Sequence, residues 1–134
     1  MSEYIVEMKH ITKRFPGIVA NDDVTIQIKK GEIFALLGEN GAGKSTMLNA
    51  VAGVWPVDEG QIIIDGTDVT KLSEYKRAAY LGRVFQDPMT GTAATMGIEE
   101  NLALAKRRGK TRFLRYGITK AEREEYKELL KILN

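Results

Sequence analysis

Residues 38–46 constrain this chain more than any other segment. Their sequence, Gly-Glu-Asn-Gly-Ala-Gly-Lys-Ser-Thr, fits the pattern G-x-x-x-x-G-K-[ST]. Glycine lets the backbone curl so that successive N–H groups converge on phosphate oxygens. A helix that begins at Lys44 adds the partial positive charge of its N-terminus to the same place. The segment therefore predicts a phosphate-binding loop between a strand and a helix.

The side chains of this loop suit a nucleoside triphosphate that carries Mg²⁺. Lys44 supplies a mobile positive charge for the β- and γ-phosphates, and the Ser45 hydroxyl is a candidate Mg²⁺ ligand. A dinucleotide-binding fingerprint is excluded, because Thr46 stands where its third Gly or Ala is needed. A Gly-rich turn without a ligand is the alternative. The residues expected to bind the nucleotide are Gly38, Asn40, Gly41, Ala42, Gly43, Lys44, Ser45 and Thr46.

Size and composition limit the class of protein. A chain of 134 residues is enough for one domain with a modest core. Cysteine is absent, which excludes disulfides, cysteine-ligated zinc and thiol catalysis within this sequence. The longest apolar run, residues 33–37, is too short to span a bilayer, and no signal peptide is visible. These features favour a cytoplasmic globular protein.

Apolar patterns predict the elements around the loop. Alternation over residues 24–29 and a less regular strand near residues 4–9 predict an antiparallel hairpin, with a turn at Phe15-Pro16-Gly17. Residues 33–37 are apolar without alternation, which predicts a central parallel strand covered on both faces. A helix over residues 44–52 should bury Met47, Leu48 and Val51 and stop at Gly53.

Beyond the first helix we expect a strand over residues 61–65, a short helix over 73–78 and a strand over 80–85. The rest of the chain has helical periodicity. Thr119 and Glu122 form a capping-box pattern. The apolar positions expected to face inward on the two last helices are Ile98, Leu102 and Ala105, then Tyr126, Leu129, Leu130 and Leu133.

Several motifs in order resemble the N-terminal part of an ATP-binding cassette (ABC) nucleotide-binding subunit. Besides the loop, the matching residues are Ala52-Gly53, Pro56, Gly60-Gln61-Ile62, Asp65-Gly66 and Gly82-Arg83-Val84-Phe85-Gln86-Asp87-Pro88. The resemblance implies an α/β fold of the P-loop NTPase class, here incomplete. It would comprise an antiparallel β hairpin region, a strand–helix core with the P-loop and a C-terminal helical segment. The implied domains are a β-subdomain with P-loop core over residues 1–95 and the start of a helical subdomain over 96–134.

The resemblance also assigns roles to residues outside the loop. Phe15 stands where an aromatic residue stacks on adenine, a contact of about 1–3 kcal/mol by analogy with base stacking. Gln86 stands where a glutamine completes the Mg²⁺ and water shell and couples the site to a membrane subunit. Trp55 matches no functional position and is expected to pack. ATP and Mg²⁺ are therefore the implied cofactors, with Ser45 and Gln86 as the metal-binding residues.

Other motifs of the family are missing from this sequence. It has no LSGGQ signature, no apolar strand ending in Asp-Glu after Gln86, and its only histidine, His10, precedes the loop. No residue is a candidate for the general base or the second acidic Mg²⁺ partner, so the catalytic set is incomplete. Its candidate members are Lys44 and Gln86. We therefore expect ATP binding without hydrolysis by this chain alone, as in a truncated form or half of a split protein.

The resemblance implies an ATPase subunit that powers a membrane transporter. Its partners would be a transmembrane permease subunit and a second nucleotide-binding subunit, and its location the inner face of the cell membrane. The alternative is a soluble ABC ATPase that acts on nucleic acid or ribosomes. It depends on the basic stretch from Lys106 to Tyr116, whose members include Arg107, Arg108, Lys110, Arg112, Phe113 and Arg115.

Residues 106–134 carry 10 Lys/Arg against 4 Asp/Glu, a net of +6, whereas residues 1–105 carry 10 against 14, a net of −4. A solvated helical face explains this excess as well, and no nucleic acid partner is expected. A GTPase or small kinase is a third class, although the Asn-Lys-x-Asp motif that reads guanine is absent. The residues contain nothing that identifies a transported substrate.

Overall fold

The computed structural model describes residues 3–108, 110 and 117–133. The chain divides into two compact units, Met1–Leu81 and Gly82–Asn134, which are described separately below. The predicted boundary after residue 95 stays a prediction.

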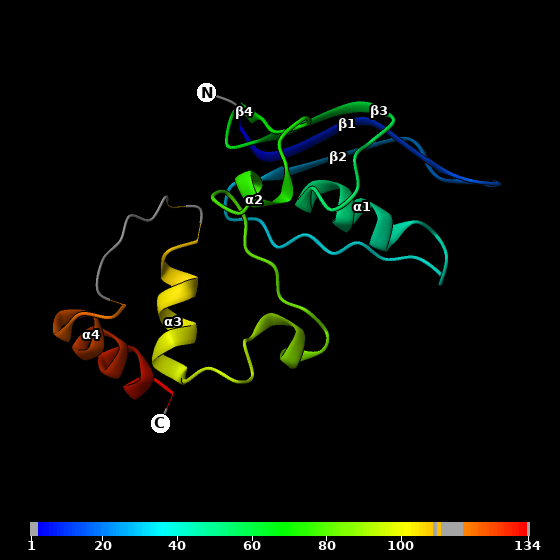
Figure 1. Cartoon of the computed structure of the whole chain (residues 1–134). Coiled ribbons are helices and arrows are strands. Elements are labelled where there is room, and N and C mark those ends of the chain that lie inside the picture. The colour runs from blue at the N-terminus through cyan, green and yellow to red at the C-terminus, as the bar shows by residue number, and fades with distance from the viewer. Residues whose placement is uncertain (1–2, 109, 111–116, 134) are drawn as a thin grey trace. The chain divides into compact units, whose positions relative to one another are not determined.

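A four-stranded antiparallel sheet forms the frame of the N-terminal unit (Figure 1). Its strands are β1 (Tyr4–Phe15), β2 (Ile18–Lys29), β3 (Glu59–Ile64) and β4 (Thr67–Asp68), in the order β2-β1-β3-β4. Pro16 and Gly17 make the turn between β1 and β2, and Gly17 adopts a φ of 79°. The predicted hairpin and its turn are confirmed, with a first strand that is longer than expected.

Side chains from the middle of the sheet form the core of this unit. Met8 on β1 lies opposite Ile26 on β2 and Ile62 on β3, and all three belong to the core or pack against it. The half-buried residues of β2 alternate with exposed ones from residue 24 to residue 29, as predicted. The buried members of the core are Met8, Ile11, Met47, Ala50, Ile62, Ile64 and Val69.

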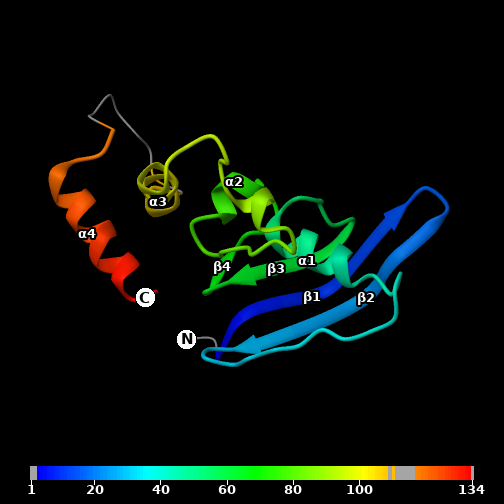
Figure 2. The ribbon, with the colours of Figure 1, turned by 90° about the horizontal axis from the view of Figure 1, so that it is seen from below.

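Two helices, α1 (Lys44–Ala52) and α2 (Glu74–Arg77), lie on one face of this sheet (Figures 1 and 2). The bounds of α1 are those predicted, and Gly53 ends it with a φ of 85°. The predicted buried face is wrong at Leu48, whose side chain is 57% exposed, whereas Ala50 is buried. Successive helical residues are 100° apart, so the face centred on Met47 continues to Ala50 and Val51 and not to Leu48.

Two predicted strands do not form. Residues 33–37 and 80–85 contain no strand, and none of the described residues pairs with them. Ile33 is 98% exposed and Leu37 is 88% exposed, while Leu36 packs against the core. A strand requires neighbours that accept its backbone hydrogen bonds, and the four paired strands of the sheet use other segments. An apolar sequence alone therefore leaves these residues extended but unpaired.

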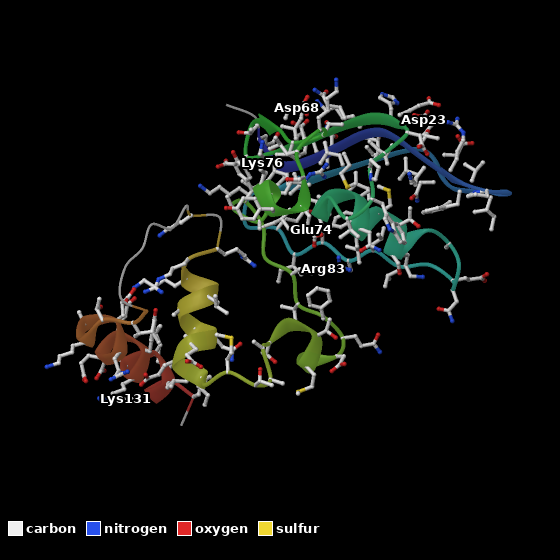
Figure 3. All side chains as sticks on the ribbon, in the orientation of Figure 1. Asp23, Asp68, Glu74, Lys76, Arg83 and Lys131 are labelled. Carbon is white, nitrogen blue, oxygen red and sulfur yellow. The ribbon has the colours of Figure 1, made fainter. Side chains whose placement is uncertain are left out.

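The C-terminal unit contains the 3₁₀ turn η1 (Pro88–Gly91) and helices α3 (Ile98–Lys106) and α4 (Lys120–Lys131), which lie side by side. The capping box is confirmed: Thr119 Oγ1 accepts from the Glu122 N–H, and Glu122 Oε2 accepts from the Thr119 N–H. Figure 3 labels Lys131 at the other end of α4.

The apolar faces predicted for α3 and α4 are only partly buried. Tyr126 and Ala103 are buried, and Leu102 and Leu130 are half-buried. The predicted inward positions at Ile98, Ala105, Leu129 and Leu133 are exposed instead. Each helix covers one narrow side of the other, so the wider apolar stripe expected from the sequence stays at the surface. Among the described residues, no helix combines the length and the apolar character needed to cross a membrane.

Candidate functional site

The loop of residues 38–46 curls as its glycines predict. Gly41 and Gly43 adopt φ values of 87° and 79°, in the left-handed region that favours glycine. The Ala42 N–H donates to the Glu39 carbonyl, which closes a turn, and Gly43 is the N-cap of α1. The first turn of α1 contains no acidic residue. The N–H groups of this turn have no acceptor within the helix, so their partial positive charge is available to an anion.

Strand β2 lies directly against this loop. A Cβ atom on Gly43 would be 2.2 Å from the Ala20 carbonyl oxygen and 2.6 Å from Asn21 Nδ2. Asn21 Nδ2 donates to the Gly43 carbonyl at 3.4 Å. Gly43 is therefore required by the close approach of β2 as well as by its φ angle.

A cavity of about 340 Å³ opens between the loop and the start of β2. Of the predicted nucleotide-binding residues, Asn40, Gly41, Gly43, Lys44, Ser45 and Thr46 line this cavity. The rest of its wall is formed by Ile18, Val19 and Ala20, which were not among the predicted site residues. Their only sequence signal is that Ile18 and Val19 are apolar residues beside a turn, and both are exposed.

Lys44 is folded back onto its own loop. Its Nζ donates to the carbonyl oxygens of Gly38, at 2.5 Å, and Glu39, at 2.7 Å. These two carbonyls hold the ammonium group close to the loop backbone. A phosphate in the cavity would offer a stronger, charge-assisted acceptor for the same ammonium group.

The two residues predicted to bind Mg²⁺ lie in different units. Ser45 is exposed and lines the cavity in the N-terminal unit. Gln86 belongs to the C-terminal unit, where it is exposed and precedes Asp87, the N-cap of η1. Within the described residues, no cluster of three or more His, Cys, Asp or Glu could hold a metal ion. A hydroxyl oxygen beside a phosphate cradle is a suitable Mg²⁺ ligand only when phosphate oxygens complete the coordination shell.

Phe15 lies at the end of β1, where it packs against Trp55. Their ring centroids are 5.2 Å apart with an interplanar angle of 79°, an edge-to-face arrangement. The ammonium group of Lys13 lies 5.4 Å from the centroid of the Phe15 ring. Phe15 is not among the residues that line the cavity. Its stacking on adenine stays a prediction, and the packing role expected for Trp55 is the contact seen here.

Arg77, a buried residue for which no role was predicted, holds the C-terminal end of α1. Its guanidinium donates to the carbonyls of Ala50, at 2.6 Å, Val51, Thr70 and Leu72. Burial lowers the pKa of this guanidinium. A Cβ on Gly53 would lie 2.9 Å from Arg77 Nε, so this contact also requires glycine after α1. No sequence motif marks such a residue, because its partners are backbone groups.

The start of the basic stretch is paired within the C-terminal unit. Lys106 bonds Glu125, and Arg107 bonds Glu122 at 2.7 Å and the Gly117 carbonyl at 2.6 Å. The further members Arg112, Phe113 and Arg115 lie outside the described residues. Lys106 and Arg107 therefore join the end of α3 to α4 through ion pairs.

Comparison with known proteins identifies relatives of this chain. The profile of the ABC transporter family matches residues 21–134. The chain is 40% identical over 111 residues to a tyrosine transport ATP-binding protein of Clostridioides difficile (strain R20291), covering 79% of this chain and 44% of that protein. It is 47% identical over 105 residues to the guanosine import ATP-binding protein NupO of Bacillus subtilis (strain 168), covering 78% of this chain and 20% of the relative. The chain thus spans less than half the length of these relatives.

Solved structures of similar fold include MJ1267, an ATP-binding cassette of an ABC transporter. It superposes with a TM-score of 0.76 at 26% identity, covering 98% of this chain and 55% of that one. The dimeric cassette MJ0796 gives a TM-score of 0.72 at 28% identity, covering 94% of this chain and 56% of that one. The chain is therefore similar to ATP-binding cassettes over nearly its whole length.

Proposed function

The chain belongs to the ABC transporter family, and we propose that it binds Mg-ATP on the loop of residues 38–46, as the nucleotide-binding portion of a transporter's energy-coupling subunit. The observation that carries this proposal is the cavity between the loop and β2. Glycines, a lysine and a hydroxyl line it, with the N-terminus of α1 at its base.

Phosphate binding follows from the residues of this cavity. The N–H groups at the start of α1 donate to phosphate oxygens, and Lys44 exchanges the carbonyls of Gly38 and Glu39 for the β- and γ-phosphates. Ser45 would hold Mg²⁺, which neutralises phosphate charge when bound. Ile18 and Val19 offer an apolar wall to the nucleoside, with Phe15 beyond it as the proposed stacking residue.

The proposed partners follow from the family. They are a transmembrane permease subunit and a second nucleotide-binding subunit, and the proposed location is the inner face of the cell membrane. Relatives named for the import of guanosine and xylose support an importer of small polar solutes. The dimeric cassette among the similar structures supports pairing of two nucleotide-binding subunits.

The proposal is tested by titrating the 134-residue chain with Mg-ATP in a calorimeter and comparing Lys44→Ala with Lys30→Ala. Lys30 is an exposed lysine in the turn after β2. A hydrogen bond to a charged group contributes about 1.5–3 kcal/mol, so Lys44→Ala should weaken binding by roughly 10- to 150-fold. Lys30→Ala should bind as the parent does.

Mg-GTP provides the control for the base in the same titration. Preferred binding of GTP would contradict the adenine contact proposed for Phe15. Equal affinity of Lys44→Ala and the parent for Mg-ATP would contradict the site itself.

A further inference from the structure

We propose that Asn21 is a positioning residue of the phosphate site, which acts by orienting the peptide bond between Gly43 and Lys44. The proposal extends the nucleotide-binding function above to a residue of β2 that does not line the cavity. Asn21 is 6% exposed, and its Nδ2 donates to the Gly43 carbonyl.

The geometry of the peptide bond links this contact to the phosphate. In a trans peptide the C=O and the following N–H lie in one plane and point in opposite directions. The Gly43 carbonyl accepts from both the Met47 N–H, at 3.0 Å, and Asn21 Nδ2, at 3.4 Å. Holding this carbonyl from two sides holds the Lys44 N–H toward the cavity that Lys44 lines. Asn21 therefore acts on a phosphate donor through Gly43.

The remaining atoms of Asn21 argue against a packing role alone. Its Oδ1 is buried and has no hydrogen-bond partner among the described residues. Buried polar atoms are normally paired, and a leucine of similar shape would fill the space without an unpaired oxygen. The amide nitrogen must face Gly43, since two oxygens would repel there. The contact with the loop thus explains an amide at a position where a hydrocarbon would pack better.

The close approach of β2 supports the same assignment. The hypothetical Cβ of Gly43 would overlap the Ala20 carbonyl and Asn21 Nδ2, so strand and loop already touch at this point. A change at Asn21 is therefore transmitted to the loop with no intervening side chain.

The test compares Asn21→Leu with Ile62→Val in the full chain. Leucine removes the donor but keeps the shape, whereas Ile62→Val loosens the core at a fully buried residue of β3. Calorimetric titrations use Mg-ATP and Mg-tripolyphosphate, which has the phosphates without the nucleoside, and thermal unfolding is followed in parallel. Loss of one hydrogen bond predicts that Asn21→Leu binds both ligands about 3- to 10-fold more weakly, with an unchanged or higher Tm. Ile62→Val should lower Tm and leave both affinities unchanged.

A second readout is the amide resonance of Lys44, which should shift less on addition of tripolyphosphate in Asn21→Leu than in the parent. Asn21→Ala serves as a second variant if the leucine variant does not fold, with the same expected loss of affinity. The inference would be overturned if the Asn21 variant bound both ligands with the affinity of the parent. It would also be overturned if the affinity fell only to the extent that Tm fell. If the parent itself binds neither ligand, the proposed function fails and this inference fails with it.

Discussion

Gly43 and Gly41 are two glycines of one loop with the same backbone requirement and different surroundings. Both have a φ in the left-handed region, but only Gly43 has atoms of β2 within reach of a Cβ. Alanine substitutions at these two positions therefore separate the free energy of backbone strain from the free energy of a clash between the loop and β2.

Gly41→Ala should cost about 1–2 kcal/mol of unfolding free energy, which is the strain of a left-handed alanine. Gly43→Ala should cost about 2–5 kcal/mol, because overpacking against the Ala20 carbonyl adds about 1–3 kcal/mol to that strain. Urea denaturation of the two variants measures the difference. Equal losses would show that β2 does not touch the loop in solution.

Helix α1 is held at both ends by other elements. Its N-cap, Gly43, accepts a hydrogen bond from Asn21 of β2, and its C-terminus is held by Arg77, which donates to the carbonyls of Ala50 and Val51. A cation at this end of a helix also complements its dipole. The helix that follows the loop thus has both ends fixed, which suits the proposed phosphate site.

Arg77→Met should destabilise the N-terminal unit by about 2–4 kcal/mol, because it removes the donor from buried carbonyls while keeping most of the side-chain volume. Arg77→Lys keeps the charge but not the planar fork and should lie between the parent and Arg77→Met. Circular dichroism during urea denaturation measures both variants. A methionine variant as stable as the parent would mean that water replaces the guanidinium.

Two carboxylates, those of Glu122 and Asp68, make the stability of the elements that contain them depend on pH. The bond from the Thr119 N–H and the ion pair with Arg107 lower the pKa of Glu122 to about 2. Hydrogen bonds from Gln61 and Thr70 likewise lower the pKa of Asp68 to about 2. Asp68 is the last residue of β4 and is labelled in Figure 3. In the folded chain each pKa lies below its ordinary value, which is 4.5 for Glu122 and 3.8 for Asp68. Each carboxylate therefore stabilises the fold above that pH, and this stabilisation is lost as the pH falls toward 2.

We therefore expect the start of α4 to lose order between pH 4.5 and pH 2, as the Glu122 carboxylate gains its proton. Carboxyl resonances in NMR give the pKa directly, and Glu122→Gln is the matched control, since its α4 should show no such transition in this range. A Glu122 pKa at its ordinary value would contradict the capping geometry.

Across its whole length, this chain has few groups that are candidates for phosphate and Mg²⁺ chemistry. Lys44, Ser45 and Gln86 are these candidates, and no apolar segment ending in Asp-Glu follows Gln86. The extended residues 33–37 also leave Ile33 and Leu37 at the surface of the N-terminal unit.

The isolated chain should accordingly bind Mg-ATP without turnover. Positioning and charge stabilisation dominate phosphoryl transfer, so a site without the remaining groups should release phosphate at the buffer rate. A coupled phosphate assay on the purified chain measures this rate. Steady release that disappears in Lys44→Ala would contradict the prediction, whereas release that persists in that variant would identify a contaminating enzyme.

Local patterns were sufficient to predict much of the fold. The hairpin with its turn, the bounds of α1 and the capping box of α4 each depend on residues within a few positions of one another, and all are confirmed. The strands predicted at residues 33–37 and 80–85 were wrong because pairing depends on distant partners, which apolar character cannot supply.

The loop of residues 38–46 could be predicted from local sequence, because its glycines, Lys44 and the helix start are adjacent in the chain. The surroundings of the loop depend on contacts between segments that are distant in the sequence. The alternation of Val24, Ile26 and Ile28 places Asn21 on the outward face, yet Asn21 is buried. The register shifts between the pairs Ile11–Val24 and Lys13–Asn21, and Asp23 has a φ of 50° there. Such a bulge reverses which side chains point inward, and it is this reversal that brings the Asn21 amide to Gly43.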